Sequence, residues 1–341
     1  MLQRDPSLER VGLVVFDEFH ERSLHADLGL AFALDCQAAL RPDLRILVMS
    51  ATLETDRIAQ LLSNAPAVHS HGRAFNVRTT YSDRRRSDRR EIAEETARTV
   101  QTALRDNEGD ILAFLPGAAE IKRAQRKLDS SALPQGVSVT PLFGSLAKKA
   151  QDQAIRPAAD RRKVVLATDI AETSLTIDGV RVVVDAGLAR RPSFDPATGM
   201  TRLETVRVTK DSADQRRGRA GRQGPGRCYR LWTQAENAAL QPRRQPEICM
   251  VDITPLALEL AVWGVTDPAD LAWLDPPPTG AYGEAVRLLQ TLGAVDRAGC
   301  VTAHGKDIAR LGVHPRLGHI VLTAGDEPST ALACDLAALS T

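Results

Sequence analysis

The chain of 341 residues is long enough for two or three domains with cores of their own. Its 43% hydrophobic and 26% charged residues are typical of a soluble globular protein. Its net charge of +1 does not indicate a nucleic-acid binder, so any such surface would have to be local. The five cysteines form no CxxC pair, which argues against a zinc site or a disulfide framework. The sequence shows neither a membrane-length apolar run nor a signal peptide, so we expect a cytoplasmic protein.

Short apolar runs alternate with helical stretches along the first two thirds of the chain. The residue pattern predicts a strand at 11–16, a mostly buried helix at 24–40, a strand at 45–50 and a helix near 91–105. Further strands are predicted at 110–117, 136–142, 162–168 and 180–187. Strand-like segments on both sides of FDPATGM at 194–200 indicate a β-hairpin. The alternation is typical of the α/β class, with a parallel sheet and crossover helices.

The pattern changes after residue 246. The segment LALELAVWGV reads as a helix, DPPPTG as a rigid loop, and residues 285–312 as a helix, a turn and a short hairpin. This order predicts a winged-helix domain at 247–311, followed at 312–341 by the start of a helical domain. The two α/β parts are expected at 1–72, as the C-terminal part of a first domain, and at 73–246, as a complete second domain.

Two carboxylates follow the first predicted strand. Asp17 and Glu18 stand at the carboxyl end of that strand, where α/β sheets bind ligands. Asp17 is suited to hold Mg²⁺ through water, and Glu18 to accept the proton of an attacking water. The alternative is an acidic turn that only caps the following helix. Ser50 and Thr52, at the end of the next strand, favour the functional interpretation because they place hydroxyls beside the carboxylates.

The stretch DQRRGRAGRQG at 214–224 carries the second set of charged groups. If it is helical, Arg219 and Arg222 share a face, and paired guanidinium groups suit the oxygens of a transferring phosphoryl group. The alternative is an ordinary basic surface helix. Glycines inside a helix cost about 1 kcal/mol each, so their presence favours close backbone packing against a ligand over a merely solvated face.

Five segments occur in a diagnostic order: DEFH at 17–20, SAT at 50–52, FLPG at 114–117, ATDIAETSLTIDGV at 167–180 and QRRGRAGR at 215–222. They resemble motifs II to VI of the DEAH/RHA helicases of superfamily 2, and DEFHERS with QRRGRAGR looks most like the bacterial HrpB-type branch. Phe19 stands where the family name has Ala. The resemblance implies tandem RecA-like, P-loop NTPase-type domains, the first incomplete, and an ATP-dependent RNA helicase that uses ATP and Mg²⁺.

The resemblance also implies roles for individual residues. Asp17 and Glu18 would serve the metal and the attacking water, His20 would couple across the cleft, and Gln215 would help to place the water. Arg219 and Arg222 would be arginine fingers, and Asp178 would lie near the ribose or a metal-bound water. Single-stranded RNA would be held along its backbone by these residues: Gly117, Thr168, Ser174, Thr176 and Arg190. Ser50 and Thr52 would couple the domains, and the hairpin around 194–208 would separate strands.

The family keeps a phosphate loop, GxxxxGK[ST], ahead of motif II, and the 341 residues contain none. GCVTAHGKD at 299–307 has the wrong spacing, and Asp307 stands where Ser or Thr is needed. We therefore expect a fragment that begins just before motif II and hydrolyses ATP poorly or not at all alone. Two alternatives stay open, a non-hydrolysing RNA-binding or regulatory module and a DNA helicase. The RNA substrate, direction of movement and oligomeric state are not encoded in any motif.

Overall fold

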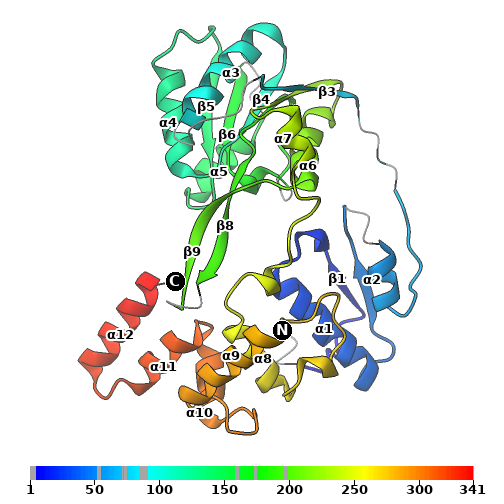
Figure 1. Cartoon of the computed structure of the whole chain (residues 1–341), viewed down its shortest axis with the longest axis vertical. Coiled ribbons are helices and arrows are strands. Elements are labelled where there is room, and N and C mark those ends of the chain that lie inside the picture. The colour runs from blue at the N-terminus through cyan, green and yellow to red at the C-terminus, as the bar shows by residue number, and fades with distance from the viewer. Residues whose placement is uncertain are drawn as a thin grey trace. The chain divides into compact units, whose positions relative to one another are not determined.

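A computed structural model describes residues 5–51, 55–70, 72, 75–83, 91–157, 161–172, 175–195 and 199–340. The chain divides into two compact units (Figure 1). Unit 1 contains Met1–Val68, Ser193–Arg202 and Gln245–Thr341, and unit 2 contains His69–Pro192 and Leu203–Arg244. The four domains expected from the sequence have other boundaries than these two units and stay a prediction.

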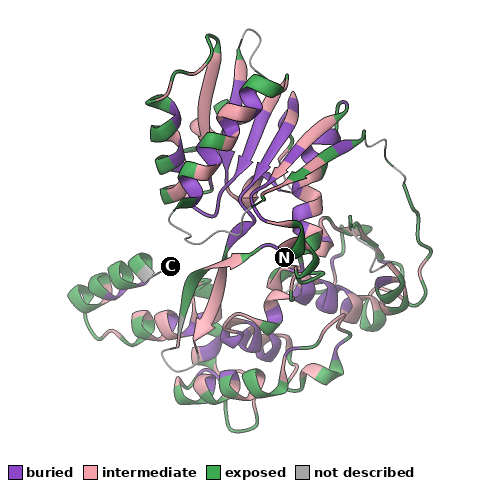
Figure 2. Cartoon of the chain, turned by 45° about the horizontal axis from the view of Figure 1, so that its top comes forward, coloured by how far each residue is buried: buried purple, intermediate pink, exposed green. Residues whose placement is uncertain are grey.

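Unit 2 is built on a six-stranded parallel sheet with the strand order β3-β10-β7-β4-β6-β5. The strands are β3 (Val77–Tyr81), β4 (Asp110–Phe114), β5 (Val137–Leu142), β6 (Arg162–Ala167), β7 (Val180–Asp185) and β10 (Gly226–Arg230). Strands β4, β6 and β7 are almost continuously buried, as expected for the centre of a parallel sheet (Figure 2).

Both faces of this sheet are covered, because alternate residues of each central strand point to opposite sides. On one face, Ile111 and Val164 pack with α3 (Ile92–Asp106) and α4 (Ala118–Asp129). On the other face, Leu112 and Val165 pack with α5 (Lys148–Ile155) and η3 (Asp169–Ala171). The remaining helical elements of unit 2 are α6 (Lys210–Gly218), η4 (Arg219–Gly221) and α7 (Gln234–Ala238). This α/β architecture confirms the predicted fold class.

Strands β8 (Leu188–Asp195) and β9 (Met200–Arg207) pair with each other in a two-stranded sheet and confirm the predicted hairpin. The base of this ribbon belongs to unit 2 and its far end to unit 1. Within unit 1, the Phe194 amide donates to the Met250 carbonyl at 3.3 Å, and Arg316 Nη1 donates to the Gly199 carbonyl at 2.6 Å. These contacts hold the described end of the ribbon to the C-terminal helices. The predicted strand-separating role of the ribbon is not tested by them.

The N-terminal part of unit 1 has two parallel strands, β1 (Leu13–Phe16) and β2 (Arg45–Val48), in the register Leu13↔Arg45. They are followed by η1 (Phe19–Glu21), α1 (Leu24–Ala39) and α2 (Thr55–Leu61). Ser23 caps α1 by accepting the Ala26 amide on its hydroxyl, at 3.2 Å.

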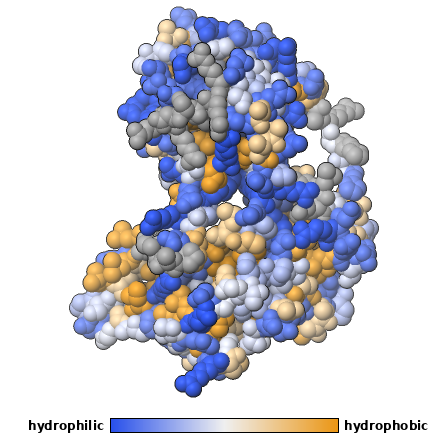
Figure 3. Space-filling view, viewed as in Figure 1, coloured by the Kyte–Doolittle hydropathy of each residue, from blue (hydrophilic) through white to orange (hydrophobic). Residues whose placement is uncertain are grey.

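The C-terminal part of unit 1 is helical. Its elements are η5 (Glu247–Cys249), α8 (Thr254–Trp263), η6 (Pro268–Asp270), α9 (Thr279–Thr291), α10 (Ala303–Leu311), α11 (Pro315–Thr323) and α12 (Glu327–Ser340). A single antiparallel bridge, Val295↔Val301, follows α9, so the expected helix and turn are present. The expected hairpin is reduced to this bridge, because residues 303–311 form α10 instead. Apolar side chains gather at the surface over α11 and α12, including Leu322 and Leu332 (Figure 3).

One core joins the two ends of unit 1. Leu28 and Phe32 of α1 pack in the same cluster as Leu256 and Leu260 of α8. The Phe32 ring stacks on Trp263 with centroids 4.4 Å apart, and Trp263 Nε1 donates to Asp35 at 2.7 Å. Residues from the two ends of the chain therefore complete a single apolar interior. No helix in the described part of the chain is both long and apolar enough to cross a membrane.

Candidate active site

The Asp17–Glu18 pair forms a tight turn directly after β1. Met49 donates its amide to the Phe16 carbonyl at 2.8 Å, and the Phe19 amide donates back to Met49 at 3.0 Å, which locks the turn beside the end of β2. Glu18 has a left-handed backbone with φ of 50°, and its amide donates to Asp17 Oδ1 at 2.8 Å. Asp17 is exposed, whereas Phe19 is 1% exposed and anchors the turn. The buried phenylalanine thus holds both carboxylates at the surface.

His20 links this turn to the segment after β2. Its side chain is 6% exposed, and its Nδ1 accepts the Ala51 amide at 3.3 Å while lying 3.4 Å from Glu18 Oε2. Its Nε2 is buried and has no hydrogen-bond partner among the described residues. Motifs II and III are therefore joined within unit 1. Ser50 is exposed next to this contact, and Thr52 lies outside the described residues.

The carboxylates do not by themselves enclose a metal ion. Within the described ranges, no group of three or more His, Cys, Asp or Glu side chains is placed to bind one. Mg²⁺ commonly keeps several waters and takes only one or two protein carboxylates together with substrate phosphates. The exposed Asp17, beside Glu18 at the carboxyl end of β1, fits that kind of ligation.

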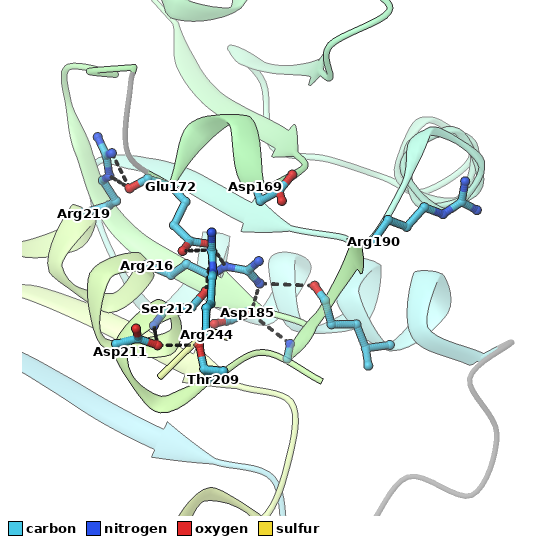
Figure 4. Close-up of polar contacts among 12 residues, drawn as sticks. Asp169, Glu172, Asp185, Arg190, Thr209, Asp211, Ser212, Arg216, Arg219 and Arg244 are labelled. Atoms are coloured by element: carbon cyan, nitrogen blue, oxygen red, sulfur yellow. Dashed lines mark hydrogen bonds and ion pairs between the residues drawn. The ribbon is translucent and has the colours of Figure 1, made fainter. Parts of the chain in front are cut away.

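In unit 2, the two predicted arginine fingers bind described residues of the same motif V segment: Glu172, Leu175 and Thr176. Arg219 is 6% exposed and donates from Nε to the Glu172 carbonyl at 2.8 Å and from Nη1 to the Leu175 carbonyl at 2.6 Å (Figure 4). Arg222 is exposed and donates from Nη1 to Thr176 Oγ1 at 3.0 Å. The regular α-helix ends at Gly218, so both arginines follow it in the short turn that continues the helix.

Arg216, in the same motif, has a different environment. It is 1% exposed and donates from Nε to Glu172 Oε2 at 2.9 Å and from Nη1 to Asp185 Oδ1 at 3.0 Å. Its guanidinium also lies 4.8 Å from the centroid of the Phe114 ring. Because Phe114 and Asp185 end two central strands, Arg216 ties motif VI to the carboxyl edge of the sheet.

Glu172 is the shared partner in this buried network. It is 3% exposed, and its second carboxylate oxygen accepts from Arg244, which also lies 3.4 Å from Ser212 Oγ (Figure 4). Burial alone would raise the pKa of Glu172, but the guanidinium groups of Arg216 and Arg244 lower it below its usual value. Burial likewise opposes the charge of Arg216, yet Asp185 and Glu172 outweigh it and raise the pKa of Arg216. Glu172 and Arg216 are therefore both charged at neutral pH.

The residues expected to hold nucleic acid lie along the carboxyl edge of the sheet. The Leu115 amide pairs with the Ala167 carbonyl at 2.8 Å, so the segments that lead to Gly117 and Thr168 start side by side. A β-carbon at Gly117 would lie 2.9 Å from Arg190 Nε, so the exposed Arg190 guanidinium packs directly on Gly117. Thr176 is exposed near Arg222, and Ser174 lies outside the described residues.

Asp178 is held by the residue that follows motif VI. Gln223 Nε2 donates to Asp178 Oδ1 at 2.9 Å, and Gln223 Oε1 accepts the Gly179 amide at 2.9 Å. Gln215 lies half-buried on α6, one residue before Arg216. The expected roles of Asp178 and Gln215 toward a nucleotide stay predictions.

The glycines of the arginine-rich segment differ from each other. A β-carbon at Gly221 would lie 2.7 Å from the Phe75 carbonyl oxygen and 2.7 Å from Val77 Cγ2, whereas one at Gly218 would meet nothing within 4 Å. Close backbone packing is therefore found at Gly221, but its partner is the chain's own β3 segment.

The network around Glu172 was not predicted from the sequence. Arg216 is 44 residues from Glu172 and 31 from Asp185, and Arg244 is 72 residues from Glu172. The only local signal was the position of Glu172 and Arg216 inside motif strings. Nothing in the sequence around Arg244 indicated a buried partner.

Comparisons with known proteins define the class of this chain. Residues 94–224 match the family model described as the helicase conserved C-terminal domain. Over 342 aligned residues the chain is 48% identical to the ATP-dependent RNA helicase HrpB of Escherichia coli K12. The alignment covers 99% of this chain and 42% of that relative. It is 37% identical to the mouse protein named probable ATP-dependent RNA helicase DHX34, covering 94% of this chain and 29% of that protein.

Solved structures agree with the sequence comparison. The crystal structure of the E. coli DEAH/RHA helicase HrpB matches with a TM-score of 0.92 and 46% identity, covering 99% of this chain and 43% of that chain. The chain therefore shares the RecA-like α/β architecture of a helicase structure. Along nearly its whole length it is similar to the DEAH/RHA helicase HrpB, which confirms the resemblance drawn from the motifs. The chain spans about two fifths of the length of the HrpB relative.

Proposed function

We propose that this chain supplies the motif II and motif VI machinery of an ATP-dependent RNA helicase. Glu18 would accept the proton of the attacking water, which Gln215 would orient, and Arg219 and Arg222 would stabilise the charge on the transferred phosphoryl group. A magnesium ion, when bound at Asp17, would neutralise phosphate charge. His20 would transmit the state of the motif II turn, together with Ser50 and Thr52, and Asp178 would lie near the ribose or a metal-bound water.

RNA would be bound at the carboxyl edge of the unit 2 sheet. Hydroxyl groups of Thr168, Ser174 and Thr176, with the Gly117 backbone and the Arg190 guanidinium, suit the sugar–phosphate backbone of a single strand. Such contacts carry no sequence information, as a motor that must pass any sequence requires. The β8–β9 ribbon would act as the strand-separating element.

The observation that carries this proposal is that both arginines hold the loop that contains Thr176. Arg219 binds the Glu172 and Leu175 carbonyls, and Arg222 binds Thr176. A phosphoryl group that draws either guanidinium away removes hydrogen bonds from this loop. Nucleotide binding and the grip on RNA would therefore be linked through a shared set of contacts.

The test uses a chimera in which these 341 residues replace the aligned region of the E. coli HrpB relative, beside the chain alone. The chimera is expected to show RNA-stimulated ATP hydrolysis, and the chain alone is expected to stay near background. Glu18→Gln should lower the rate of the chimera by about 10²–10⁴-fold, because it removes the general base. Glu21→Gln is the matched control, since Glu21 is an exposed carboxylate three residues away, and it should change the rate less than about two-fold.

A folded chimera that binds RNA but hydrolyses no ATP would contradict the helicase proposal and support a non-hydrolysing RNA-binding module. Equal stimulation by single-stranded DNA would favour the DNA helicase alternative. RNA-stimulated hydrolysis by the chain alone, abolished by Glu18→Gln, would refute the expectation that these residues need a phosphate loop supplied by another segment.

A further inference from the structure

Glu172, in the motif V segment of unit 2, is held from two directions. On one side, Arg216 of α6 binds the Glu172 carboxylate and Arg219 binds the Glu172 carbonyl. On the other side, Arg244 binds the remaining carboxylate oxygen of Glu172 (Figure 4). A single buried residue thus receives three arginines through its side chain and its backbone.

Arg244 occupies a particular place in the chain. It is the last residue of unit 2, and the chain continues at Gln245 into the C-terminal helices of unit 1. Its side chain is 24% exposed and reaches Glu172 and Ser212, whereas the neighbouring Arg243 is exposed. The point at which the chain leaves unit 2 is therefore fastened to the motif V loop.

We propose that Arg244 is a positioning residue that fixes Glu172 from the end of unit 2, and through Glu172 and the nearby Leu175 and Thr176 places Arg219 and Arg222. The effect on phosphate and RNA contacts rests on the proposed function, whereas the positioning of Glu172 by Arg244 does not.

The charge balance around Glu172 explains why Arg244 is needed. The carboxylates of Glu172 and Asp185 pair with the guanidinium groups of Arg216 and Arg244, whereas Arg219 binds the Glu172 backbone carbonyl and not its carboxylate. Asp169 and Arg191, which pair with each other, are the further charges that act on Arg244. Without Arg244, Glu172 would keep only Arg216 and its hydrogen bond with Ser212 against the cost of burial. Opening the loop would then become easier, because Glu172 could be hydrated.

The first measurement is hydrogen–deuterium exchange of the 341-residue chain and its Arg244→Gln variant. Protection of backbone amides in 169–179 is expected to fall by about ten-fold or more, while peptides from β4 keep their protection. Arg217→Gln is the control, because the Arg217 side chain is 42% exposed and its ion pair is with Asp214; it should change protection in 169–179 by less than about two-fold. Equal protection in wild type and Arg244→Gln, or an equal loss in Arg217→Gln, would overturn the proposal.

A pH series separates positioning from general loosening. The loss of amide protection caused by Arg244→Gln should be largest near pH 7.5. It should become smaller as the pH falls toward 4, because protonation of Glu172 removes the buried charge that Arg244 had balanced. In a Glu172→Gln background, Arg244→Gln should cause a smaller loss that does not depend on pH. A deficit that is the same at every pH would contradict the role of Glu172. If Arg244→Gln does not fold, Glu172→Gln replaces it as the variant that removes the ion pair, and unchanged protection of 169–179 in that variant would overturn the proposal.

Binding of oligouridine of about 20 nucleotides tests the functional consequence. Arg244→Gln should weaken binding by about three- to ten-fold with an unchanged slope against salt, because no direct phosphate contact is lost. A chain that binds no RNA even as wild type would contradict the proposed function, whereas the exchange experiment would still decide the positioning role. A reduced salt slope would mean that Arg244 touches RNA directly, which would overturn the indirect role.

Discussion

Replacement of Arg216 by methionine should destabilise unit 2 strongly. Arg216 is 1% exposed, and its fork bridges Glu172 and Asp185, which are 3% and 0% exposed. Methionine fills a similar volume but leaves both carboxylates without this cation. Removing one partner of a buried ion pair costs about 3–5 kcal/mol, because the remaining charge is neither hydrated nor balanced. For a unit of this size, such a loss corresponds to a fall in melting temperature of roughly 6–20 °C.

Calorimetry or urea unfolding followed by circular dichroism would measure this change, with Arg217→Met as the control. Arg217 is the next residue, its side chain is 42% exposed, and it lies 3.8 Å from Asp214, so its loss should cost less than about 0.5 kcal/mol. Glu172 has a lowered pKa, so its contribution in the wild type is present at neutral pH and is lost only below its usual range. In Arg216→Met the pKa of Glu172 rises. The difference in unfolding free energy between variant and wild type should therefore become smaller below about pH 5. A variant that melts within 2 °C of the wild type, or a control that loses as much, would refute this account.

Three further predictions follow from single contacts. Gly221→Ala should lower stability by about 1–3 kcal/mol, since its β-carbon would clash with the Phe75 carbonyl, whereas Gly218→Ala should be neutral or stabilising; thermal melts of the two variants compare them directly. Gly117→Ala would displace the Arg190 guanidinium and should weaken oligouridine binding about three- to ten-fold with a salt slope lower by about 1, while the melting temperature stays the same. Asp252 accepts from the Thr254 amide at 2.8 Å and lies 3.0 Å from His314 Nε2, contacts that outweigh burial and lower its pKa to about 2. Its contribution of about 2 kcal/mol should be present above pH 4 and be lost as the pH falls toward 2, and urea unfolding of Asp252→Asn should show no such loss.

The central strands of unit 2 and the long helices were predictable because their residues repeat with clear periods. The apolar runs at 110–117, 162–168 and 180–187 contain β4, β6 and β7, and the helix predicted near 91–105 is α3. Strands β3 and β10 were not predicted. Their sequences, VRTTY and GRCYR, mix charged, polar and apolar residues and carry no apolar run. They form strands because parallel pairing supplies their backbone hydrogen bonds: β3 pairs with β10, and β10 also pairs with β7.

The candidate site was predictable only as far as its motifs reach. The position of Asp17 and Glu18 after a strand follows from local sequence and its family resemblance. The shared helix face expected for Arg219 and Arg222 depended on a helical segment, and the regular helix α6 ends before them, at Gly218. The different binding partners of the motif VI arginines could not be predicted from the sequence. Arg216 and Arg219 are three residues apart, yet one binds buried carboxylates and the other main-chain carbonyls. That difference depends on partners 31–47 residues away, which no local pattern contains.

The shared core of unit 1 has a consequence for synthesis on the ribosome. The apolar face of α1 is completed by α8, which begins at Thr254, more than 200 residues after α1 has emerged. Because synthesis proceeds at about 5–20 residues per second, Leu28 and Phe32 stay without their α8 partners for roughly 10–40 s. Unit 2 lies between these segments in the sequence, and the residues of its core have been synthesised before Gln245 is added. The nascent chain therefore exposes the side chains of α1 to chaperones and to neighbouring chains while the middle of the protein folds first.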